Sequence, residues 1–209
     1  MAECFLCEAR KPRRYCPGVG ADICSPCCGA EREVTVDCPF DCEYLREARR
    51  HEKRPALSLD DFPNRDIRVT EEFLRIHEDL VIFAGRFLLE AAVETPGAAD
   101  LDVREALEAM ISTHRTLESG LVYETRPANP YAAGIQQRLQ RRIEQHRQEV
   151  AERTGLHSVR NADLLGVLVF LQRLEMQHNN GRRRSRAFLD FLRGYFPVEG
   201  PAQSPVVLA

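Results

Sequence analysis

The amino-acid sequence predicts a mainly α-helical protein: a small cysteine-rich, zinc-ribbon-like module with short β pieces, followed by an antiparallel bundle of four to five helices. All eight cysteines of the 209 residues lie between Cys4 and Cys42, a segment too short to stabilise itself by apolar burial alone. From Thr70 onward, apolar residues instead recur about every 3.6 residues, as on one buried face of a helix. The expected domains are the cysteine-rich module at 1–45, a charged short helix and linker at 46–63, the helical bundle at 64–195 and a flexible tail at 196–209.

Local capping signals divide the bundle into helices. Thr70 can cap the first helix, and Asp102 with Glu105 resembles a capping box at the start of the second. Asn129 followed by Pro130 favours the start of the third. The expected helices cover 70–95, 102–121, 130–154, 158–178 (from a cap at Ser158 or Asn161) and 185–193. The connections between them are short, which favours antiparallel neighbours.

Charge is unevenly distributed, although the net charge is only −3. Residues 56–129 carry seven basic and fifteen acidic side chains, whereas residues 130–195 carry twelve basic and six acidic ones. The basic part favours an anionic partner. Alternatively, acidic and basic helices pack side by side and partly neutralise each other.

No segment resembles a secretory signal or a membrane span. The first residues lack a basic stretch followed by an apolar one. The longest apolar run, Leu164–Leu171, is far shorter than the roughly 20 residues of a membrane-spanning helix. We therefore expect a cytoplasmic protein that does not enter a membrane. In that reducing compartment, clustered cysteines are more often metal ligands than disulfides.

The cysteine spacing predicts structural zinc. Two C-x2-C pairs have the spacing of a zinc ribbon, in which four thiolates surround one ion. The remaining cysteines interleave with these pairs and would hold a second ion. The predicted ligands are therefore Cys4, Cys7, Cys24 and Cys27 for one zinc ion, and Cys16, Cys28, Cys38 and Cys42 for the other. Short β pieces at 13–15, 21–23 and 34–36 and a charged helix at 43–53 would connect the ligands.

Other ligand assignments stay open at this point. Cys24 and Cys28 can pair as C-x3-C, which matches Cys38-x3-Cys42, and His51 can replace one thiolate. A single zinc ion with spare thiols also fits the spacing. An iron–sulfur cluster is the rival cofactor, although the tight C-x2-C-x2-C run of ferredoxins is absent.

The stretch RYCPGVGADICSPCCGAEREVTVDCPFDCEYL (14–45) resembles the N-terminal part of a family of uncharacterised bacterial proteins. The shared feature is Ile-Cys-x-x-Cys-Cys-Gly followed by Cys-Pro-x-Asp-Cys-x-Tyr-Leu. The resemblance covers about the first fifth of the chain. It implies a bacterial metal-binding protein and implies no activity.

These observations favour a non-enzymatic interaction or adaptor protein with an unidentified protein partner. No nucleophile motif, phosphate loop or dinucleotide fingerprint is present. A first alternative is nucleic-acid binding through an arginine-rich face of the bundle. The candidate contacts are Arg138, Arg141, Arg142, Arg147, Arg182, Arg183, Arg184 and Arg186.

A second alternative is a metalloenzyme that binds its metal inside the bundle. Such sites take histidines and carboxylates from facing helices. The predicted helices contain His77, His114, His146 and His178. Only Glu175-x-x-His178 matches the spacing of a di-iron carboxylate site, and that site needs two such motifs.

Overall fold

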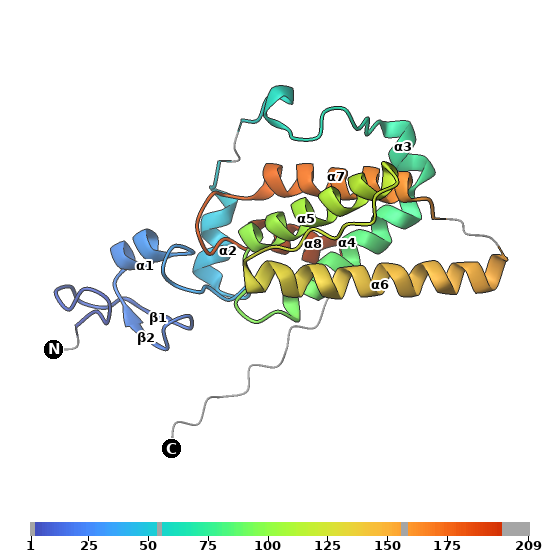
Figure 1. Ribbon diagram of the computed structural model, residues 1–209. Helices are drawn as coiled ribbons and strands as arrows, with labels where there is room; N and C mark the ends of the chain where they lie inside the picture. Colours follow the sequence, from blue (N-terminus) through green and yellow to red (C-terminus); the bar gives the residue numbers. More distant parts are fainter. Residues whose placement is uncertain (1–2, 54–55, 156–158, 198–209) are drawn as a thin grey trace, which may run out of the picture.

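The computed structural model describes residues 3–53, 56–155 and 159–197, and it confirms a mainly helical chain with a cysteine-rich N-terminal module. The described residues form β1 (Arg14–Cys16), β2 (Ala21–Ile23), α1 (Ser25–Glu31), α2 (Glu43–Arg50), a 3-10 helix (Leu59–Asp61), α3 (Glu71–Ile76), α4 (Glu78–Val93), α5 (Asp100–Glu118), α6 (Pro130–Thr154), α7 (Asn161–His178) and α8 (Ala187–Tyr195). The module lies at one end of an elongated helical bundle (Figure 1). Beyond Pro197, the expected tail lies outside the described residues.

The bundle core takes apolar residues from five helices. Helix α5 packs against both α6 and α7, and α4 contacts α6, α7 and α8. Leu88, Leu107, Leu139, Leu168 and Phe188 come one from each of these helices and are all fully buried. The apolar period of the sequence is thus explained by one shared core. Within the described residues, no helix has the length and apolar character needed to cross a membrane.

The capping signals act as predicted at two helix starts. Thr70 Oγ1 accepts a hydrogen bond from the backbone N–H of Phe73 at 3.1 Å. Asn129 Oδ1 accepts one from the N–H of Tyr131 at 3.0 Å, with proline as the first residue of α6. Gly155 ends α6 in the left-handed conformation (φ 68°), which glycine adopts at little cost.

The predicted first helix of the bundle is interrupted at His77, whose backbone (φ −109°, ψ 25°) separates α3 from α4. Phe73 on α3 packs directly on Gly166 of α7. The His77 ring lies 4.5 Å from the Phe73 ring and 3.6 Å from Asp163, measured between ring centroids and from Nε2 to Oδ1. These contacts hold α3 against the start of α7. For this reason α3 and α4 do not form one continuous helix.

Other elements also differ from the prediction. Helix α5 begins at Asp100, two residues early, and Asp102 accepts a hydrogen bond from the N–H of Ala99 (2.7 Å). Helix α1 occupies a stretch where no helix was expected. The β piece expected at 34–36 forms only an isolated bridge between Arg32 and Val36.

The buried carboxylate of Asp100 fixes the start of α8. It accepts hydrogen bonds from the N–H groups of Phe188 (3.0 Å) and Leu189 (3.2 Å), and from Ser185 Oγ (2.8 Å). Burial raises the pKa of Asp100 to about 7, although these hydrogen bonds act to lower it. Helix α8 is therefore tied to the first turn of α5 by a titratable group.

The Asp100 contribution to stability should fall as the pH rises from about 4 to about 7, because the folded protein keeps this carboxyl protonated where the unfolded chain releases the proton. Burial also raises the pKa of Glu175, which adds a change of the same sign. Urea unfolding of the wild type and Asp100→Asn at several pH values measures this contribution. A difference between the two proteins that is constant across the window would contradict the expectation.

Gly166→Ala should destabilise the protein, because the added Cβ would lie 2.5 Å from the Phe73 ring and would push α3 away from α7. We expect a loss of about 1–3 kcal/mol of unfolding free energy. Gly194→Ala in α8 is the matched control, since its Cβ meets no atom within 4 Å. Thermal unfolding of both variants tests the contact; equal melting temperatures would refute it.

Candidate metal centre and its attachment to the bundle

Four cysteines converge at one point of the module. The Sγ atoms of Cys4, Cys7, Cys24 and Cys27 all lie within 4.8 Å of one another. The Sγ atoms of Cys7 and Cys24 are 4.0 Å apart. A tetrahedral zinc ion with Zn–S distances of about 2.3 Å keeps its sulfurs roughly 3.8 Å apart. The spacing therefore fits one metal ion, held by the first of the two predicted ligand sets.

Backbone hydrogen bonds bring the two cysteine pairs together. The N–H of Glu8 donates to the carbonyl of Cys4 at 2.8 Å and closes the first knuckle. The N–H of Phe5 donates to the carbonyl of Asp22 at 3.0 Å, which attaches this knuckle to β2. The second pair directly follows β2 and lies at the start of α1. A short hairpin and one helical turn thus place all four thiols.

The electrostatics of the cluster favour a bound cation. Burial raises the pKa of the Cys4 thiol, but backbone hydrogen bonds from Cys24, Cys7 and Leu6 bring it down to about 6. The Cys24 N–H lies 3.2 Å from the Cys4 sulfur. A hydrogen bond to Cys24, together with burial and the other thiols, raises the pKa of Cys27 to about 12. Four thiolates at this point therefore need a positive charge between them.

The four remaining cysteines all lie in or against the apolar cluster of the module. Cys16 and Cys38 are buried and Cys42 is half-buried beside them. Burial raises the pKa of Cys38 to about 11, and the neighbouring Cys16 and Cys42 add to this rise. The three thiols are therefore close enough to interact. Even so, the described residues contain only one group of three or more converging metal ligands, and it is the first set.

Cys28 lies against two arginines. Its Sγ is 3.7 Å from Arg14 Nη1 and 3.8 Å from Arg32 Nη2. His51, the alternative ligand, is exposed at the end of α2, where Nε2 lies 3.2 Å from Glu47. The structure brings neither residue into the converging group.

The buried carboxylate of Glu33 attaches the module to the bundle. Glu33 follows α1, has a left-handed backbone (φ 53°) and is only 1% exposed. Its carboxylate accepts hydrogen bonds from the side chains of Arg49 (2.6 Å) and Asn180 (2.9 Å). It also accepts one from the N–H of Arg186 (3.1 Å), while the Glu33 carbonyl accepts one from the N–H of Arg184 (2.8 Å).

The arginine run before α8 takes part in this attachment. Arg182 donates to a carbonyl of the segment after α1 at 2.6 Å. Arg186 pairs with Asp37 of the module at 2.9 Å. Within this run, Arg183 and Arg184 keep exposed side chains. Sequence reasoning missed this role because the partners lie about 150 residues apart, and no local pattern links them.

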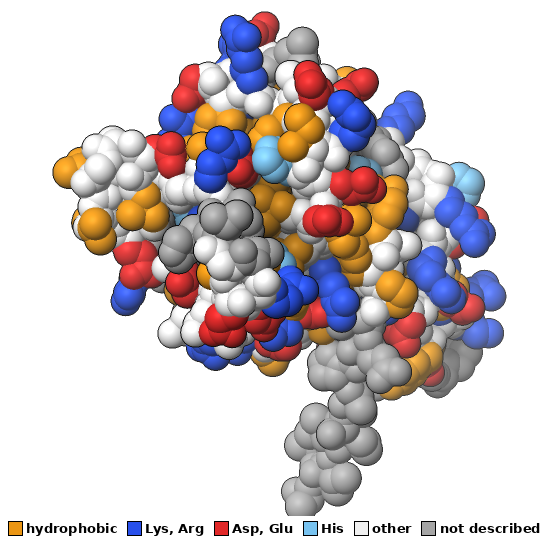
Figure 2. Space-filling model, turned by 90° about the vertical axis from the view of Figure 1, so that its right-hand side faces the viewer, with side chains coloured by type: hydrophobic (Ala, Val, Ile, Leu, Met, Phe, Trp, Pro, Cys, Tyr) orange, Lys and Arg blue, Asp and Glu red, His pale blue; other side chains and the backbone are white. Residues whose placement is uncertain are grey.

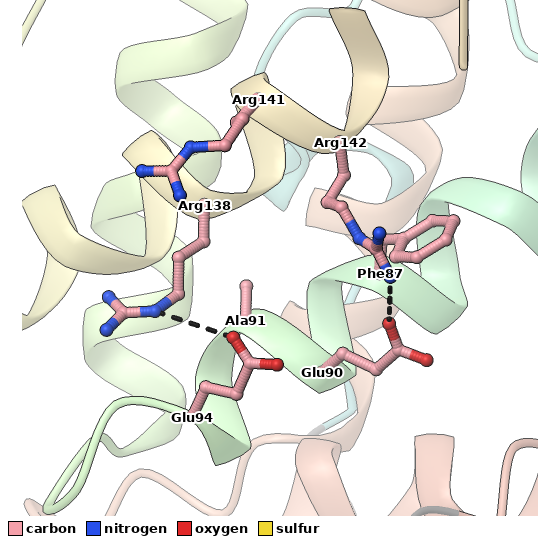
Figure 3. A pocket seen from close by; sticks show the side chains of 7 residues that line it. All are labelled: Phe87, Glu90, Ala91, Glu94, Arg138, Arg141 and Arg142. Carbon is pink, nitrogen blue, oxygen red and sulfur yellow. Dashed lines mark ion pairs between the residues drawn. The ribbon is translucent and has the colours of Figure 1, made fainter. Parts of the chain in front are cut away.

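Of the other candidate arginines, Arg138, Arg141 and Arg142 line a groove between α6 and α4 (Figure 3), whereas Arg147 does not belong to its lining. Arg138 Nε lies 3.6 Å from Glu94, and Arg142 Nη2 lies 3.5 Å from Glu90. Seen from the end of the bundle away from the module, basic and acidic side chains are interspersed and form no continuous basic face (Figure 2). The run at 182–186 instead contacts the module, so the two sets of arginines lie apart, which gives little support to a nucleic-acid surface built from both.

The four bundle histidines have separate neighbours. His77 lies beside Asp163, His114 is hydrogen-bonded to Asn161, His146 stacks on Phe83 and His178 stacks on Phe191. Burial lowers the pKa of both His114 and His146, which favours their neutral forms. None of the four belongs to a converging group of metal ligands in the described part of the chain.

No protein-family model, curated protein or solved structure matches this chain. The chemistry and the geometry of the site therefore carry the functional inference.

Glu33→Gln should destabilise the protein by about 2 kcal/mol, because Glu33 is one of two carboxylates, with Asp190, that compensate the buried guanidinium of Arg49. Glu47→Gln is a matched control: its partner Arg50 is exposed, so we expect a change of about 0.5 kcal/mol or less. Urea unfolding followed by circular dichroism compares the two. Similar effects of both substitutions would show that Glu33 is not the main contact between module and bundle.

Proposed function

We propose that this chain is a non-enzymatic zinc-binding protein whose metal is structural, and that it acts by binding a partner protein. The convergence of four cysteine sulfurs within 4.8 Å is the observation that carries the proposal. A bacterial origin, implied by the N-terminal resemblance, and a cytoplasmic location are parts of the same proposal.

The donor set supports zinc in a structural role. Four thiolates complete a tetrahedral coordination sphere and leave no position for a substrate. Apart from cysteines, the buried apolar residues of the module are Ile23, Val36 and Leu45. Such a small core cannot keep a segment of this length folded. Coordination of the metal by the cysteines would supply the missing folding free energy.

The proposal also includes a second zinc ion, bound by the other predicted set of cysteines. Cys16 and Cys42 lie close enough to Cys38 to raise the pKa of its thiol further, as neighbouring ligands of a second site would. Cys28 would have to leave Arg14 and Arg32 to complete the set. The fourth ligand is therefore the part of the second site that an experiment must decide.

Native full-length protein should contain zinc, at one to two ions per chain, and should be colourless. Elemental analysis with the visible absorption spectrum tests this expectation. If the protein contains iron and acid-labile sulfide and absorbs broadly in the visible range, its cofactor is an iron–sulfur cluster and not zinc. Protein that binds neither metal under reducing conditions would refute the proposed function.

Cys27→Ser should lower the zinc content by about one ion and increase the protease sensitivity of the module, because it removes a ligand of the converging set. Cys28→Ser is the matched comparison, one residue away. If Cys28 completes a second site, its variant also loses about one ion; if it is a spare thiol, the zinc content is unchanged. A zinc content unaffected by Cys27→Ser would contradict the first site.

A further inference from the structure

The groove between α4 and α6 has the size of a site for one side chain. It has a volume of about 70 Å³ and is lined by Phe87, Glu90, Ala91, Glu94, Arg138, Arg141 and Arg142. Sites that enclose small-molecule ligands measure about 300–1,000 Å³, so a nucleotide or cofactor does not fit. Figure 3 shows Ala91 between the Arg138 and Arg142 side chains, which descend from α6 on either side of it.

The guanidinium groups of this groove pair only weakly with carboxylates, and Arg138 Nη1 also donates a hydrogen bond to the carbonyl of Gly134 at 3.2 Å. Arg138 and Arg142 lie 3.6 and 3.5 Å from their carboxylates, whereas charge-assisted hydrogen bonds measure about 2.7–2.9 Å. Glu90 has its close contact with Arg86, at 2.9 Å. Within the described residues, Arg141 makes no ion pair or side-chain hydrogen bond that would occupy it.

The local charge is positive and the floor is apolar. Three arginines of the lining (Arg138, Arg141 and Arg142) face two glutamates (Glu90 and Glu94), for a balance of +1, and Glu90 is paired more closely with Arg86 than with Arg142. The Arg142 guanidinium lies over the Phe87 ring, 4.3 Å from its centroid, which holds it in place. Ala91 supplies a small methyl floor. Together these groups match an aliphatic stem that ends in a carboxylate.

We propose that this groove binds a glutamate or aspartate side chain from an acidic segment of a partner protein, with its carboxylate between Arg138 and Arg142. Glu94 is exposed and its ion pair is long, so an incoming carboxylate displaces it at little cost. A phosphate backbone is a poorer match, because the groove has the size of one side chain and the aromatic ring of its lining is covered by Arg142, so that bases cannot stack there. This proposal specifies that the partner protein of the proposed function carries an acidic segment, and it rests on that function.

Fluorescence anisotropy of a labelled hexaglutamate peptide with the metal-loaded full-length chain, at low ionic strength, tests the groove. Arg138→Gln and Arg142→Gln should each weaken binding about tenfold, since each removes one charged contact. Arg183→Gln, an exposed arginine of the same charge in the run before α8, is the control and should leave binding unchanged. A labelled hexaglutamine peptide should not bind.

Three outcomes would overturn the proposal: absence of hexaglutamate binding, equal losses in the control and groove variants, or tighter binding of a labelled oligothymidylate that is lost in the same groove variants. Removing the metal with a chelator separates the test of the groove from the test of the metal site. The groove is built by α4 and α6 alone, so protein stripped of metal should still bind hexaglutamate. Failure of the metal assay with intact peptide binding would refute only the zinc function.

Discussion

The two parts of this protein meet at one buried carboxylate, that of Glu33. Removing a carboxylate from water costs several kcal/mol unless strong donors replace the lost hydration. Here the donors are the guanidinium of Arg49, the amide of Asn180 and the backbone N–H of Arg186. They come from α2 and from the loop between α7 and α8. The module therefore has a single favourable position, in which all these donors meet Glu33.

The metal ligands and Glu33 are connected through α1. Cys24 immediately precedes this helix and Cys27 lies in its first turn, while Glu33 follows its last residue by two positions. An ion at the four thiols would fix one end of α1, and the bundle fixes the other through Glu33. Coordination would in this way stabilise both the fold of the module and its attachment. A structural ion at this place would therefore influence how the module sits on the bundle.

The sequence predicted those features that arise from local periodicity and spacing. The apolar faces of the bundle, the Thr70 and Asn129 caps and the convergence of two C-x2-C pairs all depend on residues close together in the chain. The break at His77 was missed because it results from a contact between Phe73 and Gly166, which only the fold brings together. The role of the arginine run was missed for the same reason.

The uneven charge of the sequence has a similar explanation. Acidic α4 lies beside basic α6, and the two contribute the pairs Arg138–Glu94 and Arg142–Glu90. The charges of the two helices thus partly neutralise each other, as one of the two sequence interpretations expected. The neutralisation is incomplete, because the pairs are long and three arginines of the groove face two carboxylates, one of which is paired more closely with Arg86. An anionic partner therefore remains compatible with helix packing, provided that it brings single carboxylates and not a continuous row of phosphates.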